Sequence, residues 1–392
     1  MKLKKKLFLK ALEVAVSVAK NRATMPILYF LRLEGCDGTL KIHATDLDSH
    51  VVSSCECEGS LIPVCAPANL LHGLAKSAGD EINLTMEKDR LKFESNGSAR
   101  LSTLPAVDMP EFPSKGLEAI GLPCADLADG LDAVSWCCSK ESAVDGAKVA
   151  HVFVKVEPKA IVCLASNGKQ LAYFSRGVIC ATTEFIIPSV YSDLISSALR
   201  LEGAVLKVSP NQVVVISDTL SVSTKRWDGP FFSVKNILEA PRKPAGEIEL
   251  APLRSALEAA YMVGTDSSRF AKVYLLPVGG RTRVQCQSEV NVYLTWLPFS
   301  MPERINVNAA LAIESLSRFK EERVKMGISS GALIMESGDL LVGTALCIKD
   351  KDVLDPEMDA INDAPPGVDE PPTLEPTKVI NPDDYAEVKV NF

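Results

Sequence analysis

The stretch Ala44-Thr45-Asp46-Leu47 occurs three times along this chain in related form. A second copy reads Ala165-Ser166-Asn167-Gly168 and a third reads Cys286-Gln287-Ser288-Glu289, which gives a period of about 121 residues. Each copy follows an apolar-alternating run, and this pattern predicts a turn at the end of a strand. We therefore expect a tandem array of three like domains.

Other features keep the same period. Ser102-Thr103 recurs as Ser223-Thr224, and Pro67, Pro188 and Asn308 each precede a helical pattern. Apolar periodicity predicts first helices at 7–20, 125–140 and 252–265, second helices at 70–76, 194–200 and 312–320, and strands such as 39–44, 160–165 and 282–287. The expected fold class is α+β, with domains at 1–117, 121–240 and 246–348.

Residues 349–392 have a different composition. They hold seven prolines and twelve Asp or Glu against four Lys or Arg, which is typical of a disordered acidic tail. This segment carries the whole formal charge of -8, so the part before it is net neutral. Attraction to a polyanion would then depend on where the cations lie rather than on their sum.

The eleven cysteines do not form the spaced pairs of a zinc site, and none of the four histidines stands at ligand spacing from them. We expect reduced thiols in a cytoplasmic protein, with no metal and no cofactor. The N-terminal lysines before Leu7-Phe8-Leu9 look in part like a signal peptide. Lys10 and Glu13 interrupt the apolar run, however, which favours an amphipathic helix, and no run is long enough to span a membrane.

The sequence contains no nucleophile elbow, P-loop, dinucleotide loop or paired-carboxylate motif. Thr45-Asp46-Leu47-Asp48 offers two carboxylates, which could in principle bind magnesium but are more typical of a turn. We therefore expect a binding protein and not an enzyme.

Lysine and arginine gather at the predicted C-terminal ends of helices, and two explanations stay open. Cations stabilise a helix C-terminus in any protein, by several tenths of a kcal/mol each. Alternatively, repeated domains hold these ends on one surface, which forms a basic track that follows phosphates without reading bases. The residues are Lys20, Arg22, Lys76, Lys140, Arg200, Arg269, Arg318 and Lys320.

Several strings carry a family resemblance: Asn21-Arg22-Ala23-Thr24-Met25-Pro26-Ile27-Leu28, Asp37-Gly38-Thr39-Leu40, Leu101-Ser102-Thr103-Leu104-Pro105-Ala106, Leu171-Ala172 and Trp227-Asp228-Gly229. Over residues 1–348 the chain resembles the bacterial DNA polymerase III beta subunit, the sliding clamp. The resemblance implies three DNA-clamp domains, a homodimeric ring with helices lining its hole, and a processivity factor for DNA replication. Such a ring encircles duplex DNA without sequence preference and tethers the replicative polymerase.

The resemblance also implies site residues. Arg22 matches a DNA-contacting position, and Lys76, Arg200 and Lys320 are assigned to DNA binding from their place on the second helices. Met109, Tyr261 and Met262 are expected near the dimer interface. A groove that binds short linear motifs of the polymerase and the clamp loader would be lined by Val149, Ser166, Gly168, Lys169, Gln170, Leu171, Phe232, Asn236, Ile237, Ala332, Leu346, Cys347 and Ile348.

The groove departs from the family pattern. Lys169-Gln170 replaces a His-Arg pair, Phe232 stands where proline is usual, and Asn236 replaces an arginine. These changes predict altered partner preference, as in a divergent or mobile-element copy. The sequence leaves open a clamp-like regulator that binds replication proteins without acting as a working ring, and it does not name the polymerase or the loader.

Overall fold

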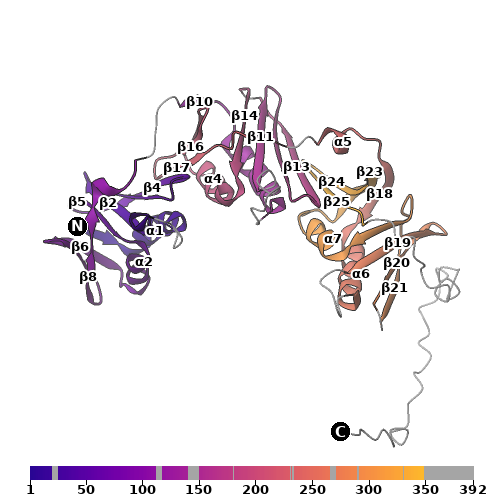
Figure 1. The fold of residues 1–392 in the computed structure, drawn as a ribbon, viewed down its shortest axis with the longest axis horizontal. Coiled ribbons are helices and arrows are strands. Elements are labelled where there is room, and N and C mark those ends of the chain that lie inside the picture. Colours follow the sequence, from indigo (N-terminus) through magenta and orange to yellow (C-terminus); the bar gives the residue numbers. More distant parts are fainter. Residues whose placement is uncertain are drawn as a thin grey trace, which may run out of the picture.

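The computed structural model describes residues 1–19, 25–111, 117–139, 150–179, 181–229, 231, 234–264, 271–288, 291–329 and 331–347, with only the backbone of Lys235 and Asn236. These residues form three α+β units that follow one another along an arc (Figure 1). We name them the first, second and third domains, using the boundaries expected from the sequence.

Each domain repeats one order of helices and strands. The first contains β1 Lys2–Lys4, α1 Lys5–Val18, β2 Phe30–Cys36, β3 Thr39–Thr45, β4 Ser49–Glu56, β5 Leu61–Pro67, α2 Ala68–Ser77, β6 Glu81–Glu87, β7 Arg90–Glu94, β8 Ser98–Ser102 and β9 Leu104–Pro105. The second contains β10 Glu118–Ile120, α3 Cys124–Val134, β11 His151–Glu157, β12 Ala160–Ser166, β13 Gln170–Gly177, β14 Thr183–Pro188, α4 Ser192–Leu199, β15 Val205–Val208, β16 Gln212–Ile216, β17 Leu220–Lys225 and α5 Lys235–Leu238. The third contains β18 Lys243–Glu249, α6 Leu250–Gly264, β19 Lys272–Val278, β20 Arg281–Gln287, β21 Val292–Leu297, β22 Ile305–Asn308, α7 Ala309–Leu316, β23 Arg323–Ser329, β24 Ala332–Ser337 and β25 Leu340–Ala345.

The helices pack one apolar face onto the sheets. In α1 the buried residues Phe8, Ala11, Leu12, Ala15 and Val18 recur every three or four positions, which is the period of one helix face. In α3 a Cβ at Gly130 would lie 2.7 Å from Cys163 Sγ and 2.9 Å from the Phe174 ring. The absent side chain therefore lets α3 lie close to β12 and β13.

Two sheets run across the domain junctions. A nine-stranded sheet joins β17 of the second domain to β4 of the first, and an eight-stranded sheet joins β13 of the second domain to β25 of the third. A four-stranded sheet lies at each end of the chain, with β8 at one edge of the first and β21 at one edge of the last. Continuous backbone hydrogen bonding thus links each domain to the next.

The repeated motif forms the same turn in the first two domains. Thr45 Oγ1 donates to the Ser49 carbonyl (2.7 Å), while Asp46 Oδ1 accepts from the Ser49 amide (2.8 Å). In the second copy Ser166 Oγ donates to the Gln170 carbonyl (2.7 Å), while Asn167 Oδ1 accepts from the Gln170 amide (2.7 Å). The expected turn at the strand end is confirmed, because short polar side chains bond to the backbone a few residues on.

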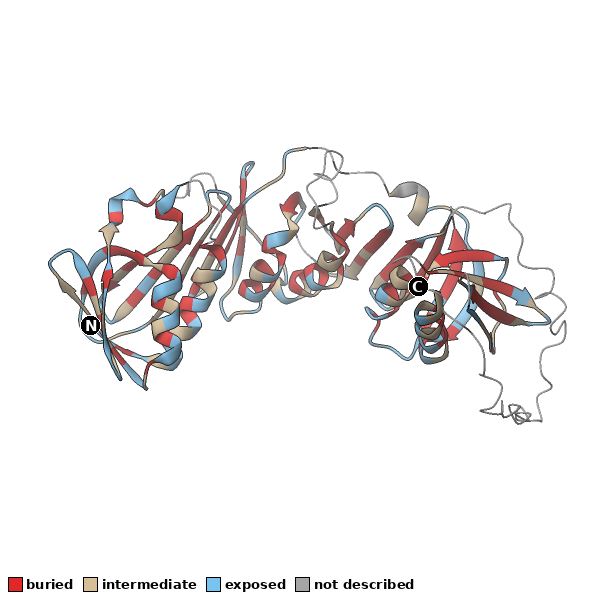
Figure 2. Ribbon diagram, turned by 60° about the horizontal axis from the view of Figure 1, so that its bottom comes forward, coloured by how far each residue is buried: buried red, intermediate tan, exposed pale blue. Residues whose placement is uncertain are grey.

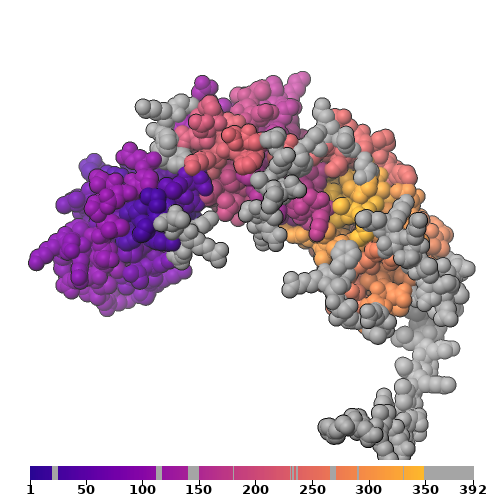
Figure 3. All heavy atoms as spheres, viewed as in Figure 1, coloured from indigo at the N-terminus to yellow at the C-terminus, as the bar shows by residue number. Residues whose placement is uncertain are grey.

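The helices α1, α2, α4, α6 and α7 lie on the concave side of the arc and the sheets form its outer layer, whereas the short α5 lies on the outer side (Figures 1 and 2). Figure 3 shows the same arc as a solid surface, with the first domain at one end and the third at the other. One large apolar core runs through the first and second domains, and another fills the third. Trp136 packs against both cores, so the second junction is filled by side chains as well as strands.

Two predicted helices are shorter than expected. The helix expected over 125–140 is α3, which ends at Val134 and is followed by a 3-10 turn over Ser135–Cys137. The sequence placed Lys320 at the end of a helix over 312–320, but α7 begins at Ala309 and ends at Leu316. Asn308 caps its start by accepting from the amides of Ala310 (3.0 Å) and Leu311 (3.4 Å), and Ser317 is its C-cap. Arg318 and Lys320 therefore follow the helix.

Candidate functional site

Three of the cations assigned to DNA binding lie in the described part of the chain. Lys76 is exposed in the last turn of α2, Arg200 is the C-cap of α4, and Lys320 is exposed just beyond α7. These helices share the concave side of the arc (Figure 1). Arg22, like Lys20, Lys140 and Arg269, lies outside the described residues.

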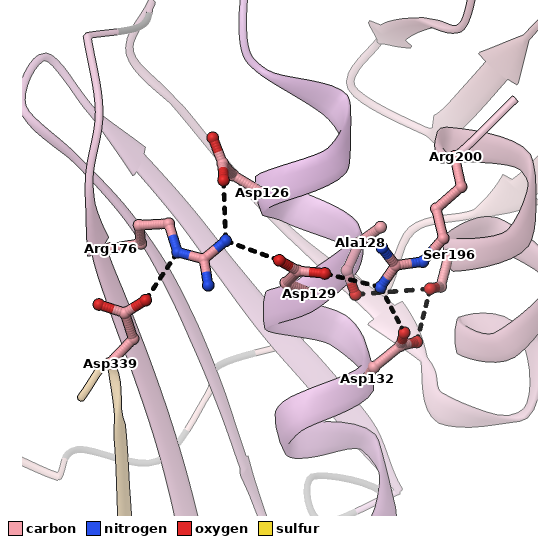
Figure 4. A network of polar contacts seen from close by, with 8 residues as sticks. All are labelled: Asp126, Ala128, Asp129, Asp132, Arg176, Ser196, Arg200 and Asp339. Carbon is pink, nitrogen blue, oxygen red and sulfur yellow. Dashed lines mark hydrogen bonds and ion pairs between the residues drawn. The ribbon is translucent and has the colours of Figure 1, made fainter. Parts of the chain in front are cut away.

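Arg200 is engaged by carboxylates of its own domain (Figure 4). Its Nη2 donates to Asp129 Oδ1 at 2.8 Å and to Asp132 Oδ2 at 2.7 Å, both on α3. Hydrogen bonds from Arg200 to Asp132 and Asp129 raise the pKa of the guanidinium above its ordinary value. The guanidinium is therefore charged but already paired.

Arg176 on β13 extends the same network across the second junction. Its Nη1 donates to Asp126 (2.8 Å) and Asp129 (2.7 Å) on α3, and its Nε donates to Asp339 (2.6 Å) in the turn between β24 and β25. Burial alone would raise the pKa of Asp129, but hydrogen bonds from Arg176 and Arg200 outweigh it and lower that pKa. The sequence analysis missed this network, although the spacing of Asp126, Asp129 and Asp132 by three residues places them on one helix face.

A cleft of about 540 Å³ is lined by cations of both the second and the third domain. Arg200, Lys320, Asp129, Asp132 and Asp339 all line it. Beside it, the Arg318 guanidinium lies 4.4 Å from the centre of the Trp136 ring, a favourable contact between a cation and an aromatic face. The concave wall at this junction thus mixes basic and acidic side chains.

The proposed linear-motif groove includes the turn Ser166-Asn167-Gly168-Lys169-Gln170, which joins β12 to β13. Gly168 and Lys169 are exposed there, whereas Ser166 is 8% exposed. Gly168 has a φ of 82°, which favours glycine, and a Cβ at this position would meet open space. The Lys169 carbonyl accepts from the Ala345 amide (2.8 Å), so the turn is held against the end of β25.

Gln170 has a structural role at this junction. It is 2% exposed, and its Nε2 donates to the Leu311 carbonyl (3.1 Å) and to Ser315 Oγ (3.0 Å) at α7. Its Oε1 accepts from Asn167 Nδ2 at 2.8 Å. The side chain expected to line the groove therefore ties the second domain to the third and presents little surface to a ligand.

The remaining described groove residues are largely apolar. Leu171 is 4% exposed and Ala332 is 9% exposed. Ile237 of α5 packs against a small apolar cluster that contains Ala332. Leu346 and Cys347 are half-buried at the end of the last strand. Val149, Phe232 and Ile348, and the side chain of Asn236, lie outside the described residues.

The expected interface residues differ in exposure. Met109 is 4% exposed because it packs with Ile27, Leu28 and Cys65 inside the first domain, so it offers almost no surface to a partner. Met262 on α6 is 70% exposed, and its neighbour Tyr261 is half-buried. The edge strand β8, which the sequence analysis did not select, exposes Ser98, Arg100 and Ser102.

Among the described residues, no group of three or more His, Cys, Asp or Glu side chains is arranged to hold a metal ion. Their cysteines are free thiols, and burial raises the pKa of Cys65 to about 11 and that of Cys138 to about 12. In the same part of the chain, no helix has the length and apolarity needed to cross a membrane.

A three-domain arc with helices on its concave side, sheets continuous across its junctions and an open sheet edge at each end is the architecture of a ring-forming DNA clamp. Residues 1–115 match the family described as "DNA polymerase III beta subunit, N-terminal domain". A "Beta sliding clamp" of Vibrio harveyi is 31% identical over 109 residues, which are 26% of this chain and 75% of that relative. The chain belongs to the DNA polymerase III beta subunit family, the beta sliding clamps.

Longer matches cover most of the chain. The "Beta sliding clamp" of Escherichia coli K12 is 23% identical over 354 residues, which are 84% of this chain and 93% of the relative. The crystal structure of the Pseudomonas aeruginosa DNA polymerase III subunit beta superposes with a TM-score of 0.78 at 17% identity, covering 89% of this chain and 99% of that one. A Caulobacter crescentus beta sliding clamp gives 0.79 at 19%, covering 89% and 98%. The predicted three-domain clamp fold is confirmed.

Proposed function

We propose that two copies of this chain close head to tail into a ring that encircles duplex DNA and holds a polymerase on it, without catalysing a reaction. The observation that carries the proposal is the pair of open sheet edges, β8 and β21, at the two ends of the arc. The family membership favours this working clamp over a regulator that binds replication proteins without forming a ring.

The internal repeat predicts how these edges meet. Inside the chain, Thr224 of β17 pairs with Ser49 of β4, and Thr344 of β25 pairs with Gln170 of β13. With the period of about 121 residues, the equivalent of Thr224 in the first domain is Thr103, and the equivalent of Gln170 in the third domain is Asn291. The interchain register therefore places Thr103 opposite Asn291 of the second copy.

The same register places Leu101 opposite Tyr293. Its counterparts inside the chain are Val222 opposite Val51 and Val342 opposite Ala172, all almost fully buried. Tyr293 is half-buried in the single chain, as expected of a residue that a second copy would cover. Val292, which falls opposite Ser102, is 48% exposed.

A disulfide experiment tests this register. Residues directly opposite in antiparallel strands have Cβ atoms about 4.5–5.5 Å apart, close enough for cross-linking after small movements. Under mild oxidation the Ser102→Cys/Val292→Cys variant should form a covalently closed dimer. The control pair Arg100→Cys/Val292→Cys is displaced by two residues and should cross-link far more slowly. Failure of the first pair, or equal rates for both, would contradict the proposed interface.

DNA encirclement needs a separate test. Purified protein, opened and closed on a fluorescent nicked circle by a bacterial clamp loader or by reversible denaturant treatment, should stay on the circle through gel filtration at high salt. Cutting the circle should release it, because topology rather than tight binding retains a ring. Equal retention on circular and linear DNA would refute the clamp proposal.

Contacts to DNA are proposed for the basic helix ends. Replacing Arg22, Lys76, Arg200 and Lys320 by alanine should weaken binding to a short duplex, and each lost phosphate contact should reduce the slope of log K against log salt by about 0.9. An unchanged slope would leave these cations with a helix-capping role only. The groove residues Leu346, Cys347 and Ile237 are proposed to receive the apolar anchors of a polymerase or loader motif.

A further inference from the structure

The carboxylates that engage Arg200 lie where a clamp would meet the phosphate backbone. The helix α4, of which Arg200 is the C-cap, lies on the concave side of the arc, and 43% of the Arg200 side chain is exposed. The guanidinium therefore faces solvent on the side expected to surround DNA. Its hydrogen bonds nevertheless go to Asp129 and Asp132.

The two carboxylates resemble a phosphate in what they offer. Together they present two oxygens to one guanidinium nitrogen at 2.8 and 2.7 Å, the range of charge-assisted hydrogen bonds. Ser196 Oγ donates to Asp132 Oδ1 at 2.5 Å, which fixes the orientation of that carboxylate. Figure 4 shows Arg200, Ser196 and Asp132 converging in this way.

Local charge opposes a phosphate as well. The network contains four carboxylates, from Asp126, Asp129, Asp132 and Asp339, against two guanidinium groups. A DNA phosphate approaching Arg200 meets a guanidinium whose Nη2 is already bound by Asp129 and Asp132, and it must lie beside their negative charge. Both effects weaken DNA contact at the second domain, while Lys76 and Lys320 have no carboxylate among the ion pairs of the described residues.

We propose that Asp129 and Asp132 compete with the DNA backbone for Arg200, so that the concave side of the second domain binds duplex DNA weakly. The proposal rests on the encircling role above, because that role brings the DNA to the concave side. Its consequence is a clamp whose DNA contacts are uneven around the hole, with a low-affinity sector centred on α3 and α4.

The test uses the full-length Asp129→Asn/Asp132→Asn variant and a short fluorescent linear duplex. Anisotropy should show about a tenfold gain in affinity at 50 mM salt and a slope of log K against log salt steeper by about 0.9, the amount expected for one added phosphate contact. Adding Arg200→Ala to this variant should remove the gain. Both carboxylates are on the surface, with side chains 39% and 48% exposed, so the amides should leave the fold intact.

A matched control separates competition from net charge. The Asp126→Asn/Asp339→Asn variant also removes two negative charges from this network, but it leaves the pairs of Arg200 with Asp129 and Asp132 in place. An equal gain in this control, or no gain in Asp129→Asn/Asp132→Asn, would overturn the proposal. Retention of wild-type protein on nicked circles is measured separately, so a failure of the encircling role is distinguishable from a failure of the competition.

Discussion

Acidification should destabilise the first domain through His43. This residue lies on β3, its side chain is 18% exposed, and its buried Nε2 makes no hydrogen bond to any described residue. Burial, and then the neighbouring His50, Arg32 and Lys41, lower the pKa of His43 to about 4. Glu34 opposes this shift, but its carboxylate is 4.0 Å away and half exposed, so the cation remains disfavoured.

The sign and size follow from proton linkage. The unfolded chain binds a proton at His43 near pH 6.5 and the folded chain does so only near pH 4, so stability is complete above 6.5 and is lost as pH falls between these values. At pH 5.0 this difference corresponds to about 2 kcal/mol relative to pH 7.5. His50, whose pKa burial also lowers, adds to the loss in the same direction.

Two measurements check this reasoning. Histidine-selective NMR, assigned with the His43→Gln variant, should give a titration midpoint for His43 far below 6.5. The urea unfolding transition that includes the first domain should then show about 2 kcal/mol less pH dependence in His43→Gln than in wild type between pH 7.5 and 5.0. A His43 midpoint near 6.5, or the same pH dependence in both proteins, would refute the argument.

Two further predictions concern the junctions. Tyr191 Oη donates to Asp46 Oδ2 at 2.7 Å across the first junction, so Tyr191→Phe should lower the free energy of unfolding by about 1–2 kcal/mol. The control Tyr173→Phe should change it little, because the Tyr173 hydroxyl makes no hydrogen bond among the described residues. Equal losses in the two variants would contradict the role of Tyr191. Alkylating the half-buried Cys347 with a bulky maleimide should block binding of a Leu- and Phe-containing motif peptide measured by anisotropy, and the Cys347→Ser variant should bind equally before and after treatment. Unchanged binding by the alkylated wild type would place the peptide elsewhere.

The repeat was the most informative part of the sequence because its turns depend on local chemistry. Thr45 and Ser166 each bond to the backbone of their own turn, so a period of short polar residues was enough to locate equivalent strand ends. Apolar periodicity likewise predicted α1 and α6 to within a few residues. The end of α7 was missed because Ser317 and Arg318 are acceptable helix residues, and nothing local to them marks the stop at Leu316.

The site was harder to predict, because the position of a residue in the repeat does not determine which partners its side chain contacts. Gln170 falls at a groove position, but its side chain donates hydrogen bonds to Leu311 and Ser315 of another domain, more than 100 residues away in sequence. Met109 was expected near the dimer interface but is buried in a cluster with Ile27, Leu28 and Cys65. Arg200 was identified as a basic helix end, while its partners on α3 required the packing of two helices to become visible.

The sheets that cross the domain junctions also bear on how long a ring would last. The two domain junctions within each chain join parts of one polypeptide, so they form at any protein concentration. Assembly of the proposed ring depends on concentration only through the two contacts between β8 and β21. When one of these opens, the other still holds both chains, and reclosing is intramolecular at an effective concentration near millimolar. Opening and falling apart are then separate kinetic events. The lifetime of the assembled pair exceeds that of a single contact by roughly the ratio of the reclosing rate to the opening rate, even at the low copy numbers of a cell.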